Sequence, residues 1–139
     1  MEFKDYLTIW GAILSSILGA IKLFELWRDR HRVEVSYSFT SDVHEGNTIT
    51  IRNLSNRQII ISYWELFTAR DKNGKHELEL LSYKDYDTSD LQIAANSSYS
   101  LHFCEANYFN TSHNFLKGRK IYIKLCIAGR SHRIYSVYP

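Results

Sequence analysis

The sequence has almost no proline and little glycine. Its only proline is Pro139, and six glycines are spread over 139 residues. Disordered and low-complexity segments are rich in proline and glycine. The scarcity of these two residues, together with 14% aromatic residues, excludes a largely disordered chain. There is no internal repeat, and a net charge of +2 indicates no particular class of partner. The composition is typical of one small, ordered, strand-rich domain.

Cysteine is also scarce, and the common catalytic signatures are missing. Cys104 and Cys126 form no CxxC pair, so zinc and dithiol redox sites have no support, and we expect two half-buried thiols on strands. The six histidines are scattered without metal-ligand spacing. No HExxH, no GxSxG and no glycine-rich phosphate loop is present. We therefore predict a protein that is not an enzyme and that uses no metal or cofactor.

One long apolar segment, residues 6–27, has the pattern of a helix that crosses a membrane. Its uncharged part, residues 6–21, would form about 24 Å of helix, against about 30 Å for the hydrocarbon core of a bilayer. Lys22 interrupts the apolar run, but its ammonium group can extend toward the interface and pair with Glu25. Two alternatives are a cleaved signal peptide, which the acidic start disfavours, and a buried core helix, which the short uncharged run leaves open.

This helix separates small side chains from large ones rather than polar from apolar. At about 100° per residue, two rows with four-residue spacing lie side by side and form one small face. Membrane helices pack closely on other helices through such faces, so we predict a homo-oligomer in the lipid bilayer. The predicted helix–helix contacts are Gly11, Ala12, Ser15, Ser16, Gly19 and Ala20.

Basic residues follow the apolar segment and few precede it. Arg28, Arg30 and Arg32 come after it, and only Lys4 comes before it. The positive-inside rule then predicts a single-pass protein of the inner (plasma) membrane whose C-terminal domain is cytoplasmic. We divide the chain into an anchor, residues 1–32, and a β-domain, residues 33–139. Because neither Gly nor Pro separates Arg28 from Arg32, we expect the helix to continue almost to the first strand.

The remaining residues alternate between polar and apolar in short segments, which predicts strands with one buried face. A denser apolar run, residues 59–67, contains Trp64 as a core candidate, and Asn73-Gly74 is a strong hairpin-turn signal. The predicted fold is mainly β: an N-terminal transmembrane helix, then an antiparallel β-sandwich or small β-barrel that resembles the immunoglobulin-like class. The Cys…Trp…Cys order of true immunoglobulin domains is absent. The seven expected strands lie near residues 33–39, 48–52, 59–67, 77–81, 99–103, 121–125 and 134–138.

The charge is unevenly distributed along this domain. Residues 105–139 have a net charge of +5, whereas residues 65–90 have a net charge of −3. Lys120, Tyr122 and Lys124 should share one strand face, and the register of the turn decides whether Arg133 and Tyr135 lie beside them. Cations next to aromatic rings suit a nucleotide-like ligand, an anionic membrane leaflet, or simply a solvated face. No nucleic acid polymer is expected as a partner.

These features predict a small membrane sensor whose cytosolic β-domain detects a ligand or protein partner and whose helix oligomerises. A bacterial stress or anti-phage effector is one such protein. Some anti-phage effectors combine short membrane helices with a β-barrel that senses a cyclic nucleotide, and this chain is similar to them in layout only. The alternative is a membrane-anchored scaffold or accessory subunit of a larger complex, for which the same small face would contact the helices of a partner.

Overall fold

The computed structural model describes residues 2–28 and 32–139. Residues Arg32–Pro139 form one compact unit, which is the expected β-domain with Arg32 added, and the helix α1 (Phe3–Arg28) belongs to the other unit. Two short helices, η1 (Glu105–Asn107) and α2 (His113–Leu116), lie in the connection before the seventh strand. The strands are β1 (Val33–Ser38), β2 (Asn47–Asn53), β3 (Ile59–Lys72), β4 (Lys75–Tyr83), β5 (Leu91–Ile93), β6 (Ser98–Phe103), β7 (Arg119–Ile127) and β8 (Arg133–Tyr138).

The helix α1 is long and apolar enough to cross a membrane, and none of its residues is buried in the structure. Two of its hydroxyl groups bond to the helix backbone: Thr8 donates to the Lys4 carbonyl at 3.0 Å and Ser16 donates to the Ala12 carbonyl at 2.9 Å. The predicted partner of Lys22 is confirmed, since its Nζ lies 2.9 Å from Glu25 Oε2. The predicted continuation beyond Arg28 falls on residues 29–31, which lie outside the described residues.

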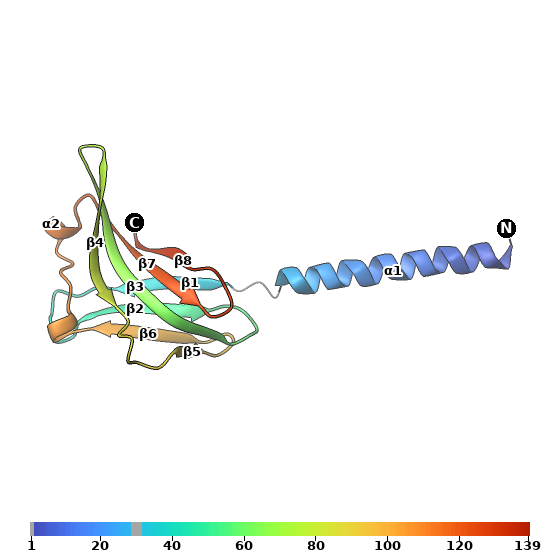
Figure 1. Ribbon diagram of the computed structural model, residues 1–139, viewed down its shortest axis with the longest axis horizontal. Coiled ribbons are helices and arrows are strands. Elements are labelled where there is room, and N and C mark those ends of the chain that lie inside the picture. The colour runs from blue at the N-terminus through green and yellow to red at the C-terminus, as the bar shows by residue number, and fades with distance from the viewer. Residues whose placement is uncertain (1, 29–31) are drawn as a thin grey trace. The chain divides into compact units, whose positions relative to one another are not determined.

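Two antiparallel sheets make up the β-domain (Figure 1). The smaller sheet has the order β1-β2-β6, and the larger one has the order β4-β3-β7-β8, with β5 also paired to β3. The predicted fold, an N-terminal helix followed by an antiparallel, mainly β domain, is confirmed. Two facing sheets favour the sandwich over the closed barrel. The described residues contain eight strands rather than seven, because the three-residue β5 is too short to show alternation.

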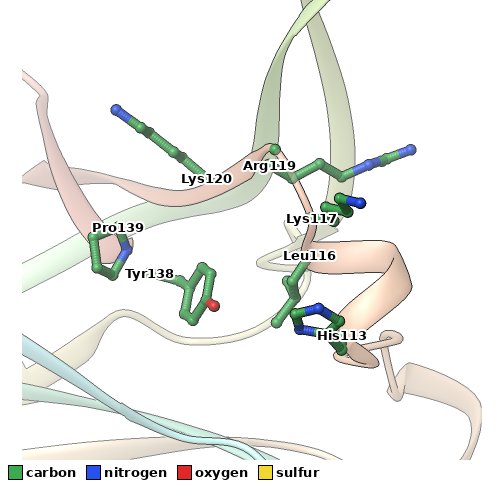
Figure 2. A pocket seen from close by; sticks show the side chains of 8 residues that line it. His113, Leu116, Lys117, Arg119, Lys120, Tyr138 and Pro139 are labelled. Carbon is green, nitrogen blue, oxygen red and sulfur yellow. The ribbon is translucent and has the colours of Figure 1, made fainter.

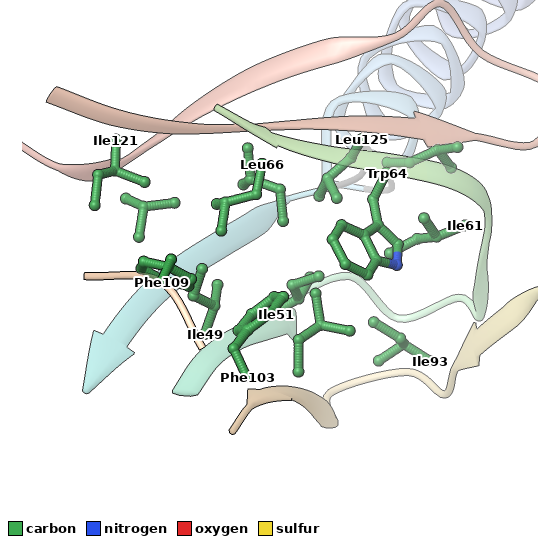
Figure 3. Packing of buried hydrophobic residues seen from close by; sticks show 14 of the residues in the cluster. Ile49, Ile51, Ile61, Trp64, Leu66, Ile93, Phe103, Phe109, Ile121 and Leu125 are labelled. Atoms are coloured by element: carbon green, nitrogen blue, oxygen red, sulfur yellow. The ribbon is translucent and has the colours of Figure 1, made fainter. Parts of the chain in front are cut away.

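The core lies between the two sheets (Figure 3). Ile49 and Ile51 of β2 face inward from the smaller sheet and are fully buried. The larger sheet supplies alternate apolar residues of β7, together with Trp64, whose ring packs edge-to-face on Phe103 at 5.8 Å between centroids. Trp64 is 8% exposed, so its predicted place in the core is confirmed.

Strand β3 is the centre of the larger sheet, because β4, β5 and β7 all pair with it. Its register with β7 shifts between Ile61 and Tyr63. The shift reverses which residues face inward: Ile59 and Ile61 are buried before it, and Trp64 and Leu66 after it. This reversal explains why the apolar run of β3 shows no simple alternation in the sequence.

The two thiols differ from the expected pair of half-buried strand cysteines. Cys126 is half-buried on β7, as expected, but Cys104 is exposed and lies just after β6 has ended. Phe103 is the last residue of β6 that pairs with β2, and Cys104 begins the connection that contains η1. Both cysteines are free.

Candidate functional site

Strand β7 presents Lys120 and Lys124 on the outer face of the larger sheet. Ile121, Ile123 and Leu125 are fully buried, whereas the alternate residues are half-buried or exposed. The prediction that Lys120, Tyr122 and Lys124 share one face is therefore confirmed. Two of them already contact β3 across the sheet: Lys124 Nζ lies 3.6 Å from Glu65, and the Tyr122 ring stacks on Phe67 at 5.8 Å between centroids.

The β7–β8 register, which the sequence left open, does not place Arg133 and Tyr135 beside these residues. In the β7–β8 register Tyr135 lies opposite Ile123, and Arg133 lies opposite Leu125. Residues directly opposite one another in an antiparallel pair share a face, so both belong to the core-facing side of the sheet. Tyr135 packs against the core, and Arg133 is exposed at the start of β8. The five residues do not form one site.

A pocket of about 320 Å³ lies where α2 meets β7 and the end of β8 (Figure 2). Leu116 and Tyr138 contribute apolar surface to it, and the segment 117–120 forms its cationic rim. Figure 2 shows the side chains of Arg119 and Lys120 pointing away from the Tyr138 ring in different directions. The cations thus surround the mouth of the pocket and do not fill it.

The three rim cations differ in how strongly they are already engaged. Arg119 donates to Glu79 at 2.6 Å, and its guanidinium lies 4.4 Å from the centre of the Phe115 ring. Among residues 2–28 and 32–139, no acidic side chain pairs with Lys117 or Lys120. A surface lysine without a partner can turn its ammonium group toward an anion at little cost. Lys117 and Lys120 are therefore the residues of this pocket that can accept a new anionic partner.

A groove, called the edge groove below, lies between the edge strands β4 and β6 of the two sheets. It consists of two adjoining cavities of about 460 and 320 Å³ that share four lining residues. The four shared residues are Trp64, Tyr83, Asp85 and Leu101. Trp64 and Leu101 are nearly buried, which makes the floor apolar, whereas Asp85 contributes negative charge at the rim. Neither edge strand has a further strand beside it in the sheet order.

Lys84 closes one end of the edge groove and is almost fully buried. Its ammonium group donates to the Ser62 carbonyl at 2.8 Å and lies 3.4 Å from Asp90. A buried ammonium group needs such partners because it has lost its hydration. Lys84 therefore holds the 84–90 loop against β3, and it contributes no available charge to the groove.

Two further chemical features bear on what the β-domain can do. In the described part of the chain, no group of three His, Cys, Asp or Glu side chains is arranged to hold a metal ion. The rings of Tyr63 and Tyr86 stack at 5.4 Å between centroids. Burial, followed by hydrogen bonding with Tyr86, raises the pKa of Tyr63 to about 12, so this phenol stays protonated at neutral pH.

The predicted small face of α1 is open along its length. A methyl group added at Gly11 or Gly19 would meet no atom within 4 Å. Ala12, Ser15, Ser16 and Ala20 are exposed on the same helix. The face is therefore available for close approach by another helix.

Comparison with known proteins identifies no family. No protein-family model matches the chain, and no curated protein matches it. Among solved structures, the chain is similar to the X-ray structure of Northeast Structural Genomics Consortium target SoR45, at 17% sequence identity and a TM-score of 0.39. The alignment covers 79% of this chain and 82% of that chain. This likeness assigns neither a family nor a function.

Proposed function

We propose that this is a single-pass protein of the inner (plasma) membrane. Its helix α1 anchors the chain in the bilayer and associates with the α1 helices of other copies. Its cytoplasmic β-domain recognises a ligand or a protein partner. The observation that supports it most is α1 itself, 26 residues long with no residue buried against the rest of the structure. An apolar helix of this length is stable when lipid or other helices surround it. The hydroxyl groups of Thr8 and Ser16 bond within the helix, an arrangement that suits lipid surroundings.

Self-association through the small face is tested by adding bulk to it. Gly11→Leu or Gly19→Leu should weaken the oligomer about tenfold, since packing through a small face depends on close approach of the two backbones. The oligomer size is measured for the full-length protein in nanodiscs. Ile17→Phe adds bulk to the opposite, large face and should leave the oligomer unchanged.

The same experiment separates the sensor from the scaffold. Cysteine crosslinks between copies at positions 11 or 15 support self-association. An unchanged oligomer in both glycine variants, with crosslinks only to a different protein, would reject the self-associating sensor and leave the membrane-anchored scaffold. The edge groove favours that second function, because an apolar floor between two unpaired edge strands suits an extended protein segment.

Orientation in the membrane is tested with the exposed thiol of Cys104. In a Cys126→Ser variant, Cys104 is the only reactive cysteine. A membrane-impermeant maleimide should leave it unlabelled in intact cells and label it after permeabilisation, because the basic flank of α1 favours a cytoplasmic β-domain. Labelling in intact cells would place the β-domain on the opposite side of the membrane.

We assign ligand recognition to the pocket between Leu116 and Tyr138, with Lys117 and Lys120 binding the anionic part of a nucleotide-like ligand. Cyclic nucleotides are the first compounds to test, by calorimetry on the full-length protein in nanodiscs. The double variant Lys117→Ala/Lys120→Ala should weaken binding at least about tenfold. Lys72→Ala/Lys75→Ala, which removes the same charge from the β3–β4 hairpin tip, should bind normally. If no cyclic nucleotide binds, this assignment is wrong.

In a bacterial stress or anti-phage effector, ligand binding by the β-domain would change how the α1 helices pack on one another. This biological role remains a prediction from the layout of the chain.

A further inference from the structure

One end of the β-domain, called the entry end below, is where the chain arrives from the anchor. Three turns, residues 54–58, 94–97 and 128–132, lie at this end with Arg32. Hydrogen bonds connect the parts: Leu54 N–H donates to the Arg32 carbonyl at 2.8 Å, and Asn96 N–H donates to the Ser55 carbonyl at 3.1 Å. The β7–β8 turn lies at the same end, beside the start of β1 (Figure 1). Ala128 N–H of this turn donates to the Ile60 carbonyl at 2.8 Å.

The charge of the entry end has a single sign. Its three turns and the first residue of β8 contain no aspartate or glutamate. The nearest acidic residue on β1, Glu34, lies 3.6 Å from Arg52 and is already paired. Leu54 adds an apolar side chain that is 50% exposed. The arginines of the entry end are Arg32, Arg57, Arg130 and Arg133.

The opposite end of the β-domain differs. It includes the 39–46 loop, the tip of the β3–β4 hairpin and the connection that follows β6. Acidic residues occur in all three, namely Asp42, Glu45, Asp71 and Glu105. Lysines lie at that end as well, so its charge is mixed. Of the two ends, the entry end alone is uniformly basic.

The length of the chain limits how far the entry end can be from the membrane. Arg28 is the last residue of α1, and Arg32 is four residues later. Four peptide units span at most about 15 Å. If α1 crosses the bilayer, Arg32 must therefore lie within reach of the lipid headgroups, and the surface closest to them is the basic one.

We propose that the entry end of the β-domain docks on the anionic headgroups of the membrane that holds α1, with Arg130 and Arg133 as its principal contacts. This inference rests on the proposed membrane anchoring. Guanidinium groups bind phosphate through paired hydrogen bonds, and both side chains are exposed. Leu54 contributes apolar contact at the interface. Docking would hold the β-domain in one orientation on the membrane surface.

The test uses the full-length chain in nanodiscs and a fluorophore on the β7–β8 turn. The label is attached at Ser131→Cys in a Cys104→Ser/Cys126→Ser background, and lipids with a quencher near the headgroup report proximity. Compared with pure phosphatidylcholine, nanodiscs with about one-third phosphatidylglycerol should increase quenching at least about twofold, and high salt should reverse the increase. A label at Lys72→Cys, on the β3–β4 hairpin tip, should show no increase.

Charge-reversed variants make the result specific. Arg130→Glu/Arg133→Glu should abolish the increase at position 131, whereas Lys72→Glu/Lys75→Glu, with the same change in net charge, should retain it. Equal quenching in both lipids, or equal loss in both variants, would overturn the docking inference. A chain that fails to enter nanodiscs of either composition would instead overturn the membrane anchoring, so the two failures are distinguishable.

Discussion

Replacing Gly46 with alanine should lower the free energy of unfolding of the β-domain by at least about 3 kcal/mol. Gly46 has a φ of 76°, in the left-handed region that side chains disfavour. A Cβ atom there would lie 2.6 Å from the Phe103 carbonyl oxygen and 2.7 Å from Cys104 Cβ. The carbonyl oxygen belongs to the backbone at the end of β6, so it cannot move without disturbing the smaller sheet. Denaturant unfolding of the full-length protein, followed by circular dichroism, measures the change.

Gly74 is a matched control for this substitution. It has the same φ of 76°, but nothing lies within 4 Å of the position that its Cβ would occupy. Gly74→Ala should therefore lower the free energy of unfolding only by the backbone strain of a left-handed alanine, about 1–2 kcal/mol. Equal destabilisation by the two substitutions would show that the close approach of Gly46 to β6 contributes nothing.

Replacing Asn53 with alanine should cost about 3 kcal/mol of stability, because its fully buried side chain connects three segments. Its amide nitrogen donates to the carbonyls of Arg57 at 2.7 Å and of Ile93 and Ala94 at 3.1 Å. Its oxygen accepts hydrogen bonds from the backbone and the hydroxyl of Ser55. Alanine would leave these groups without a partner inside the protein, where each unsatisfied group costs about 1–3 kcal/mol. The same denaturant titration measures the loss.

Gln58→Ala is the control for the Asn53 prediction. Gln58 lies in the turn after Asn53, and its exposed amide makes one side-chain hydrogen bond, to Gln92 at 3.0 Å. Water can replace that partner, so the cost should stay below about 0.5 kcal/mol. A loss for Asn53→Ala as small as this would mean that water reaches the buried carbonyls.

The fold could be predicted from the sequence wherever one strand alternates regularly or a turn has a strong local signal. Strand β7 alternates without interruption, and Asn73-Gly74 sets the β3–β4 hairpin with φ values of 53° and 76°. Strand β3 has a register shift that no local pattern announces. The hydrogen bonds of Asn53 could not be predicted either, because its partners include residues about 40 positions later in the chain.

The candidate sites depend on contacts between segments far apart in the chain, so the sequence predicted them only in part. Lys120 and Arg133 each lie near the start of a strand, β7 and β8 respectively. Because these two strands are antiparallel neighbours, their starts lie at opposite ends of the sheet. The positive charge of residues 105–139 thus divides between the Tyr138 pocket and the entry end. The edge groove requires both sheets in place, since Trp64 and Leu101 meet only across the core.

The position of Trp64 has a practical consequence for spectroscopy. The protein contains three tryptophans, and the other two, Trp10 and Trp27, both belong to α1. Replacing those two with phenylalanine leaves one indole as the only tryptophan emitter, on the floor of the edge groove and in edge-to-face contact with Phe103. The emission wavelength of that indole depends on how much water reaches it. The chain thus contains an intrinsic optical reporter of whether the edge groove is empty or occupied.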